Sequence, residues 1–147
     1  MALQTPVLKV AFASDNRRQV NQHFGSALGF VTYDISPQGG VVTGFADFPE
    51  EAMDGNENKL AAKVDFLEGC AAVFVMAIGA SAIKQLMSKG IQPIRIGEVD
   101  GIDDLIADVC RAMKDGGVAW IDRAVAQQTR AKSPDRFSRM EDEGWDS

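Results

Sequence analysis

The sequence predicts an α/β domain in which a mixed sheet is covered by helices. The first part of the chain contains three short segments rich in β-branched and aromatic residues, with no helical pattern between them. The remainder alternates apolar, strand-like runs with segments whose apolar residues recur at helical spacing. Successive strands followed by alternating helices and strands are typical of a mixed sheet with helices on its faces.

Five segments are expected to form the strands. The first is almost entirely apolar, which indicates burial on both faces of the sheet. The turn sequence SPQGG separates the second segment from the third, so these two should form a hairpin. In chain order, the expected strands are Val7–Ala13, Phe30–Ile35, Val41–Phe48, Cys70–Met76 and Gln92–Ile96.

Four helices are expected, three of them ended by glycine, which readily adopts the backbone conformation that follows a helix. The first carries Leu60, Val64 and Leu67 at helical spacing and ends at Gly69. The others are a helix from the AIGAS segment to Gly90, an amphipathic helix over residues 102–113 that ends at Gly116–Gly117, and a last helix over Val118–Arg130 anchored by Trp120.

This order, β-β-β-α-β-α-β-α with a terminal helix, matches the ribonuclease-H-like architecture: three layers, with a mixed five-stranded sheet between helices. The first and fourth strands would then be parallel neighbours. Ligands of open α/β sheets bind beyond the carboxyl ends of such strands, at the switch point. The loop Ser14–Gly25, whose sequence is compatible with a short helical turn, and the segment Ala77–Ser81 should meet there. The domain is expected to cover residues 1–130, and the tail 131–147 to pack only locally.

Composition narrows the class of protein. The 147 residues carry a formal net charge of −6, with a pI of about 4.7. Such a balance disfavours non-specific binding to nucleic acid, because phosphate neutralisation needs a basic patch. No apolar run approaches the roughly 20 residues that cross a bilayer, and the first ten residues lack the regions of a signal peptide. We therefore expect a cytoplasmic protein with no nucleic-acid or membrane partner.

Cysteine and histidine are scarce, with Cys70, Cys110 and His23 as their only representatives. A four-cysteine cluster site cannot be built within one such chain. Metal chemistry would therefore need few protein ligands, oxygen ligands, a second subunit, or a metal species that carries most of its own ligands. Cys70 begins its strand, away from the His23 end, and Cys110 lies beside the inward stripe of a helix. Both are expected to be small buried apolar residues rather than ligands.

His23 is the principal candidate ligand, because neutral imidazole is a common metal ligand that suits iron. It lies in NQHFG, within the first switch-point loop. Gly25 lets the backbone turn tightly, and Phe24 can anchor the loop and hold the imidazole outward. The alternative is a surface or capping histidine without a ligand. Hydrogen bonds or charge nearby could come from Asn21, Gln22 and Arg17.

The second loop contains the start of a helix. Free N–H groups and the helix dipole at Gly79, Ala80 and Ser81 would attract an anion. The alternative is an ordinary helix start with Ser81 near the cap. Met76 ends the preceding strand at the His23 end, where its thioether is either a second candidate metal ligand or part of the core.

A different function on the same architecture is a metal-dependent hydrolase or nuclease, which needs several carboxylates around two metal ions. Asp15 follows the first strand, but Asp34 and Asp47 lie on the hairpin and are not assembled with it by the predicted topology. No phosphate-binding loop or GxSxG elbow occurs. A second alternative is a related domain that binds another small anionic ligand.

Four segments resemble the nitrogenase iron–molybdenum cofactor carrier family, which contains NifX-like and NafY-like dinitrogenase cofactor-binding domains. They are KVAFASDNRRQVNQHFGSALGFVTYDI, DGNENKLAAKVDFLEGCAAVFV, IGASAIKQLMSKGIQPI and the closing EGWD. The likeness covers nearly the whole chain, and its most specific parts are the QHFG loop and the GAS helix start. Within the family, the expected likeness is greatest to the NifX group, on the basis of EGWD and of the expected lack of an extra N-terminal domain.

The resemblance implies a domain with no catalysis of its own. Such domains bind an iron–sulfur precursor cluster or the finished iron–molybdenum cofactor transiently and pass it along the assembly line. The implied partners are a NifB-like cluster donor and a NifEN-like scaffold. The family's cluster-binding histidine corresponds to His23, whereas Ile78 stands beside Gly79 and no ligand cysteine carries over. An iron-only precursor, a molybdenum cofactor and a vanadium cofactor all remain compatible with this resemblance.

Overall fold

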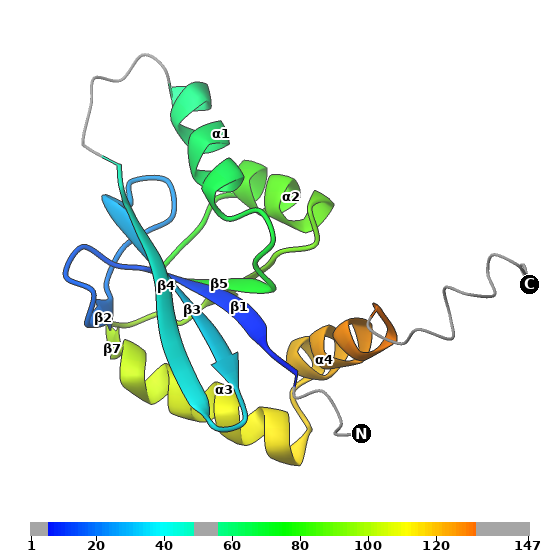
Figure 1. The fold of residues 1–147 in the computed structure, drawn as a ribbon. Coiled ribbons are helices and arrows are strands. Elements are labelled where there is room, and N and C mark those ends of the chain that lie inside the picture. The colour runs from blue at the N-terminus through cyan, green and yellow to red at the C-terminus, as the bar shows by residue number, and fades with distance from the viewer. Residues whose placement is uncertain (1–5, 49–55, 132–147) are drawn as a thin grey trace, which may run out of the picture.

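A mixed five-stranded sheet organises the described part of the chain, residues 6–48 and 56–131 of the computed structural model. Its strands are β1 (Leu8–Ala13), β3 (Gly29–Ser36), β4 (Gly39–Asp47), β5 (Ala72–Val75) and β6 (Gln92–Arg95). The spatial order is β4-β3-β1-β5-β6 (Figure 1). β3 is antiparallel to β1 and β4, whereas β5 is parallel to β1 and β6. The predicted parallel pairing of β1 with the strand that follows the first helix is therefore confirmed.

The central strand β1 is buried on both faces, as its apolar sequence predicts. Val10, Ala11, Phe12 and Ala13 are each 0% exposed. Because side chains alternate across a strand, Val10 and Phe12 enter one apolar cluster while Ala11 and Ala13 enter the other. The sheet thus has a hydrophobic core on each side.

Helices cover both cores, which gives the predicted three layers (Figure 1). The helices are α1 (Asn56–Phe66), α2 (Ala80–Ser88), α3 (Ile102–Asp115) and α4 (Ala119–Ala131). Buried residues of α1 and α2 join the cluster that contains Ala11, and those of α3 and α4 join the cluster that contains Phe12. Gly90 follows α2 with φ of +79° and donates its N–H to the Met87 carbonyl, so the predicted glycine stop is confirmed.

Aromatic rings fix α4 to the sheet. The Phe12 ring stacks on Phe74 of β5 at 5.2 Å between centroids, and Phe74 in turn meets Trp120 of α4 edge-on at 6.2 Å. The predicted anchoring of the last helix by Trp120 is therefore confirmed. The tail residues 132–147, which include EGWD, lie outside the described residues.

Two very short strands were not predicted from the sequence. β2 (Gln19–Val20) lies inside the segment expected to be a loop, and it pairs antiparallel with β7 (Asp100–Gly101). The described structure of that segment contains bends, this strand and a turn, but no helical turn. Strands of two residues carry too few positions for an alternating pattern, so the periodicity that identifies the longer strands does not detect them.

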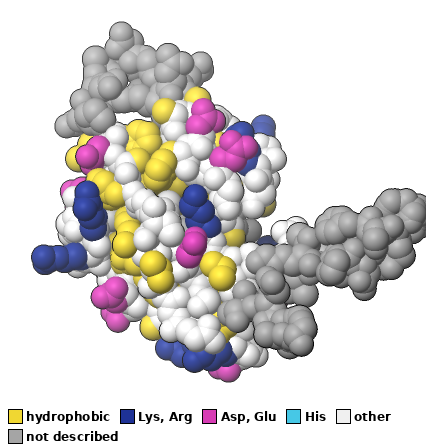
Figure 2. Space-filling model, in the orientation of Figure 1, with side chains coloured by type: hydrophobic (Ala, Val, Ile, Leu, Met, Phe, Trp, Pro, Cys, Tyr) yellow, Lys and Arg dark blue, Asp and Glu magenta, His cyan; other side chains and the backbone are white. Residues whose placement is uncertain are grey.

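The outer strand β4 presents apolar side chains to solvent. Val41 is 68% exposed and Val42 is 56% exposed. Figure 2 shows hydrophobic side chains interspersed with charged ones on the face that includes the β3–β4 hairpin. Among the described residues, no helix is both long enough and apolar enough to span a membrane.

Candidate functional site

The two predicted switch-point loops meet at the carboxyl ends of β1 and β5. The Met76 N–H, directly after β5, donates to the Gln22 carbonyl at 2.9 Å. The Phe24 N–H donates to the Ala77 carbonyl at 2.8 Å. These two bonds attach residues 22–24 to the chain that leaves β5 and leads into α2, so the juxtaposition inferred from the topology is confirmed.

His23 is exposed between two anchored neighbours. Phe24 is 0% exposed, and Gln22 is half-buried. The Gln22 side-chain oxygen accepts a hydrogen bond from the Leu28 N–H at 2.9 Å, which closes the loop on the far side of the histidine. The chain therefore presents an accessible imidazole from a short segment that is hydrogen-bonded on both sides.

Phe24 fixes the loop to the core, as expected from its position next to His23. Its ring lies 5.5 Å from Phe30 of β3, and Phe30 lies 5.8 Å from Phe48. Phe48 then meets Phe66 of α1 at 6.2 Å, completing a row of four rings. Because the Phe24 ring is fully buried, its contribution to a ligand site is anchorage rather than contact through the ring.

Lys63 of α1 also holds this loop, and the sequence prediction missed it. Its side chain is buried, with only 3% of the residue exposed. Its ammonium donates to the Gly25 carbonyl at 2.8 Å and makes a longer contact with the Phe24 carbonyl at 3.5 Å. In the sequence, the sign of this role is the helical position of Lys63: it lies one residue before Val64 and three after Leu60, on the inward face of the predicted helix.

A polar network shapes the beginning of the same loop. Ser14 is 0% exposed, and its hydroxyl oxygen accepts the Arg17 N–H at 2.8 Å. The Asn21 N–H donates to the Ala13 carbonyl at 3.2 Å, and the Asn21 amide donates to the Asp15 carboxylate at 2.8 Å. Asn21 thus helps to return the loop to the end of β1.

Arg17 is not brought beside Phe24. It adopts φ of +63°, and its guanidinium carbon lies 3.8 Å from the centre of the Phe45 ring. Phe45 packs against the core on the α3 side, whereas Phe24 belongs to the core on the α1 side. In this structure the Arg17 cation is engaged in a cation–π contact on the β3–β4 hairpin.

α2 starts at Ala80, three residues after Ala77, whose carbonyl accepts the Phe24 N–H of the loop. Gly79 is the N-cap residue, in an extended conformation, and no side chain caps the helix. Ser81 is therefore inside the first turn rather than at the cap. Ala80 and Ser81 are exposed, which leaves the first turn of the helix accessible beside the His23 loop. Met76 is half-buried.

Cys70 is buried near the amino end of its strand, as expected, although β5 begins two residues later at Ala72; Cys110 is half-buried rather than fully buried. Cys70 is 4% exposed and precedes β5 at the amino end. The N–H of the next residue, Ala71, donates to the backbone carbonyl of Lys9 at 2.7 Å. Burial raises the pKa of the Cys70 thiol to about 11; nearby Lys9 lowers it and Asp34 raises it, each by less than burial does. Cys110 is half-buried against the core on the α3 side.

The acidic residues considered for a nuclease do not form one site. Asp34 pairs in register with Lys9 near the start of β1, whereas Asp47 pairs with Gly29 near the opposite end of the sheet. Asp15 is exposed and bonded to Asn21. Among the residues whose side chains the structure describes, within 6–48 and 60–128, no group of three or more His, Cys, Asp or Glu is placed to hold a metal ion.

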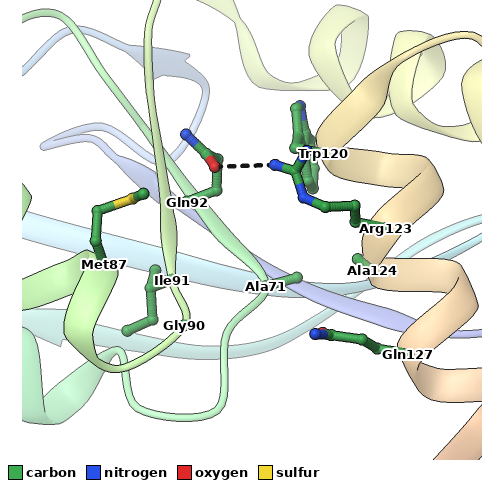
Figure 3. A pocket seen from close by; sticks show the side chains of 9 residues that line it. All are labelled: Ala71, Met87, Gly90, Ile91, Gln92, Trp120, Arg123, Ala124 and Gln127. Carbon is green, nitrogen blue, oxygen red and sulfur yellow. Dashed lines mark hydrogen bonds between the residues drawn. The ribbon is translucent and has the colours of Figure 1, made fainter.

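A pocket of about 240 Å³ is lined by residues next to the amino ends of β5 and β6, whereas the His23 loop meets the chain that leaves the carboxyl end of β5. Figure 3 shows the side chains that line the pocket. It is bordered by Met87 at the end of α2, by Gln92 at the start of β6 and by Trp120 of α4. Arg123 of α4 reaches across it and donates to the Gln92 side-chain oxygen at 3.4 Å. None of its lining residues is His, Cys, Asp or Glu.

Known proteins are similar to this chain in sequence and in fold. Residues 6–112 match the family model described as dinitrogenase iron-molybdenum cofactor. Protein NifX of Azotobacter vinelandii is 45% identical over 140 residues, covering 95% of this chain and 88% of NifX. The FeMo cofactor biosynthesis protein NifB of the same organism is 32% identical over 127 residues, which is 83% of this chain but 25% of NifB.

A solved structure supports the fold. The crystal structure of PH0822 superimposes with a TM-score of 0.56 at 27% sequence identity, covering 71% of this chain and 90% of that chain. The family match covers most of the chain, and the similarity to NifX extends over nearly all of both sequences. The chain therefore belongs to the dinitrogenase iron-molybdenum cofactor family.

Proposed function

We propose that this protein is a carrier in nitrogenase cofactor biosynthesis, with His23 as its principal ligand to the cargo. The cargo is an iron–sulfur precursor cluster or the finished iron–molybdenum cofactor, bound transiently and passed on without catalysis. Membership of the dinitrogenase iron-molybdenum cofactor family supports the cargo class. Similarity to NifX and to part of NifB supports the place in cofactor assembly.

The observation that carries the ligand assignment is the way His23 is presented. Its side chain is exposed, while Gln22 and Phe24 on either side are hydrogen-bonded to the chain leaving β5. A ligand whose backbone is already ordered loses less conformational freedom when it binds. Neutral imidazole is also a suitable iron ligand. A cargo that supplies its own sulfides would need few further protein ligands.

The neighbouring helix start supplies complementary electrostatics for an anionic cluster. The N–H groups at Gly79, Ala80 and Ser81 carry the positive end of the α2 dipole, and no side chain caps them. Met76 lies beside Gln22 and is the candidate second ligand. In this proposal Asn21, Gln22, Phe24 and Gly25 hold the loop, and Arg17 would have to leave the Phe45 ring to reach the cargo.

The strand order and mixed directions of the sheet support the proposal of a ribonuclease-H-like domain. The proposed place of action of the carrier is the cytoplasm. A NifB-like donor and a NifEN-like scaffold are the proposed partners that deliver and receive the cluster. The hydrolase alternative is not favoured, because the acids suggested for it lie at different ends of the sheet.

Replacement of the histidine tests the ligand assignment. His23→Ala is expected to weaken binding of extracted iron–molybdenum cofactor at least tenfold, about 1.4 kcal/mol, in an anaerobic titration. Ser26→Ala is the matched control, because Ser26 is also exposed and lies three residues further along the loop. The control should bind like the wild type, and both variants should unfold at the wild-type urea concentration.

Equal affinity of His23→Ala and wild type, with both folded, would remove His23 from the site. The next candidates would then be Met76 and the start of α2.

A further inference from the structure

Lys63 is a buried cation directly beneath the loop that carries His23. It lies on the inward face of α1 and is 3% exposed, between the buried Val64 and the half-buried Leu60. An ammonium at such a depth costs free energy unless hydrogen bonds compensate for the lost water. The Gly25 carbonyl at 2.8 Å and the Phe24 carbonyl at 3.5 Å provide such compensation.

These contacts join distant parts of the chain. Lys63 and Gly25 are 38 residues apart in the sequence, so the bond fixes α1 to the loop after His23. Phe24 is then held at three points: its N–H by the Ala77 carbonyl, its ring by the core, and its carbonyl by the long contact from Lys63. Among these contacts, the hydrogen bonds from Lys63 are those that hold the backbone carbonyls directly after His23.

We propose that Lys63 is a positioning residue for cluster binding, which holds the Phe24 and Gly25 carbonyls so that the His23 imidazole is presented in one orientation. This inference rests on the proposed role of His23 as ligand. It assigns no contact between Lys63 and the cluster, because the lysine side chain is buried and directed at the backbone of the loop.

A methionine at position 63 would fill a similar space but could not donate a hydrogen bond. Methionine has a similar length, is apolar and adapts to irregular spaces. It has no donor, however, so in Lys63→Met the Gly25 carbonyl would lose its 2.8 Å partner. The loop segment after His23 would keep its apolar packing on the α1-side core, which includes the row of rings Phe24, Phe30, Phe48 and Phe66.

The first test uses the protein without cluster. In the wild type, NMR should detect a Lys63 ammonium signal protected from solvent exchange, with a through-bond coupling to the Gly25 carbonyl carbon. In Lys63→Met, the amide proton of Phe24 should exchange with solvent at least tenfold faster than in the wild type. Lys114→Met is the matched control, because Lys114 is an exposed lysine near the end of α3, and it should leave Phe24 exchange unchanged.

The second test is a double-mutant cycle on the affinity for extracted iron–molybdenum cofactor. Lys63→Met should weaken binding at least threefold in the wild-type background. In the His23→Ala background the same change should alter the remaining affinity by less than twofold, because the lysine acts only through the histidine. Lys63→Arg retains the charge and the donors, and should bind more tightly than Lys63→Met.

The outcomes separate the two proposals. If His23→Ala does not weaken binding, the assignment of His23 as the ligand in the proposed function is wrong. If His23→Ala weakens binding but Lys63→Met stays within twofold of wild type, or weakens both backgrounds equally, Lys63 is not a positioning residue. Should Lys63→Met fail to fold, the wild-type ammonium signal and the Lys63→Arg cycle decide. An ammonium in free exchange, or a Lys63→Arg change that weakens binding by the same factor in the wild-type and His23→Ala backgrounds, would overturn the inference.

Discussion

The two ends of the central sheet are built differently. At the carboxyl ends of β1 and β5, the loop around His23 is attached by backbone hydrogen bonds from Met76 and to Ala77, and by the buried Lys63. At the amino ends, the pocket between α2 and α4 is spanned by a long, exposed contact from Arg123 to Gln92 at 3.4 Å. The accessible imidazole lies at the first end, and the buried thiol of Cys70 lies toward the second.

This difference indicates how a chain poor in ligands can handle a cluster. A thiolate binds iron strongly and would favour permanent retention of the cargo. The Cys70 thiol is withdrawn into the core, and burial raises its pKa to about 11, so it stays protonated at neutral pH. The end attached by these hydrogen bonds presents a single imidazole, which under the proposed function would suit a cargo that the carrier releases.

The largest expected effect concerns the ring that anchors the site loop. Phe24→Ala removes a fully buried ring and is expected to lower the free energy of unfolding by about 3–5 kcal/mol. Phe74→Ala is the matched control, because Phe74 is also buried but belongs to the core on the α3 side. Both changes should lower the urea midpoint, whereas only Phe24→Ala should weaken cofactor binding under conditions where the variants remain folded. Equal effects on binding would show that the loop depends on general stability alone.

The next effect is a loss of stability in alkaline solution. Burial raises the pKa of Cys70 from 9.0 to about 11, so the folded protein binds this proton more tightly than the unfolded chain does. The stabilisation is complete below about pH 9 and is lost as the pH rises through about 11, by at most about 3 kcal/mol. Urea unfolding from pH 8 to pH 11 should therefore show a steeper decline for the wild type than for Cys70→Ala.

Tyr33 contributes to the same alkaline decline in both proteins, because burial and the nearby Asp103 raise its pKa. The relevant measurement is thus the difference between wild type and Cys70→Ala. Parallel curves for the two proteins would mean that the thiol ionises in the folded state as it does in the unfolded chain.

Two glutamines offer a direct comparison of the two ends. The Gln22 side-chain oxygen accepts a backbone N–H at 2.9 Å, so Gln22→Ala is expected to cost about 1 kcal/mol. The Gln92 side-chain oxygen accepts only the long contact from exposed Arg123, so Gln92→Ala should cost less than about 0.5 kcal/mol. Urea unfolding measures both. A larger cost at Gln92 would reverse the proposed contrast in rigidity.

The smallest effect is expected from the thiols. Because Cys70 is buried toward the amino end and Cys110 packs against the α3-side core, the double change to alanine should leave cofactor affinity within about threefold, less than roughly 0.7 kcal/mol. The measurement is the anaerobic titration used for His23→Ala. Loss of binding by a folded double variant would bring a thiolate into the site.

Much of this architecture follows from sequence patterns with a direct physical cause. The apolar run over β1 predicts its burial on both faces, and the turn SPQGG predicts the β3–β4 hairpin. The parallel pairing of β1 with β5 then locates the two switch-point loops. Each of these predictions depends on several residues that act together, which is why the pattern is strong enough to identify.

The interior of the site loop could not be predicted in the same way. The β2–β7 pairing involves two residues on each side. Arg17 adopts φ of +63°, its N–H donates to the Ser14 hydroxyl, and its guanidinium lies over the Phe45 ring. Lys63 was overlooked because a lysine on a helix is ordinarily solvated, and its carbonyl partners are 38 and 39 residues away. Such contacts depend on tertiary structure rather than on local spacing.

The most direct test of the central claim is spectroscopic detection of a nitrogen from His23 on the bound cluster. His23 is the only histidine in the chain, so protein made without a polyhistidine tag and with ¹⁵N-labelled histidine carries a label at a single residue. After anaerobic loading with extracted iron–molybdenum cofactor, pulsed electron–nuclear double resonance should show a ¹⁵N coupling that is absent from the unlabelled sample. Stoichiometric binding with no ¹⁵N coupling would contradict the assignment of His23 as the ligand.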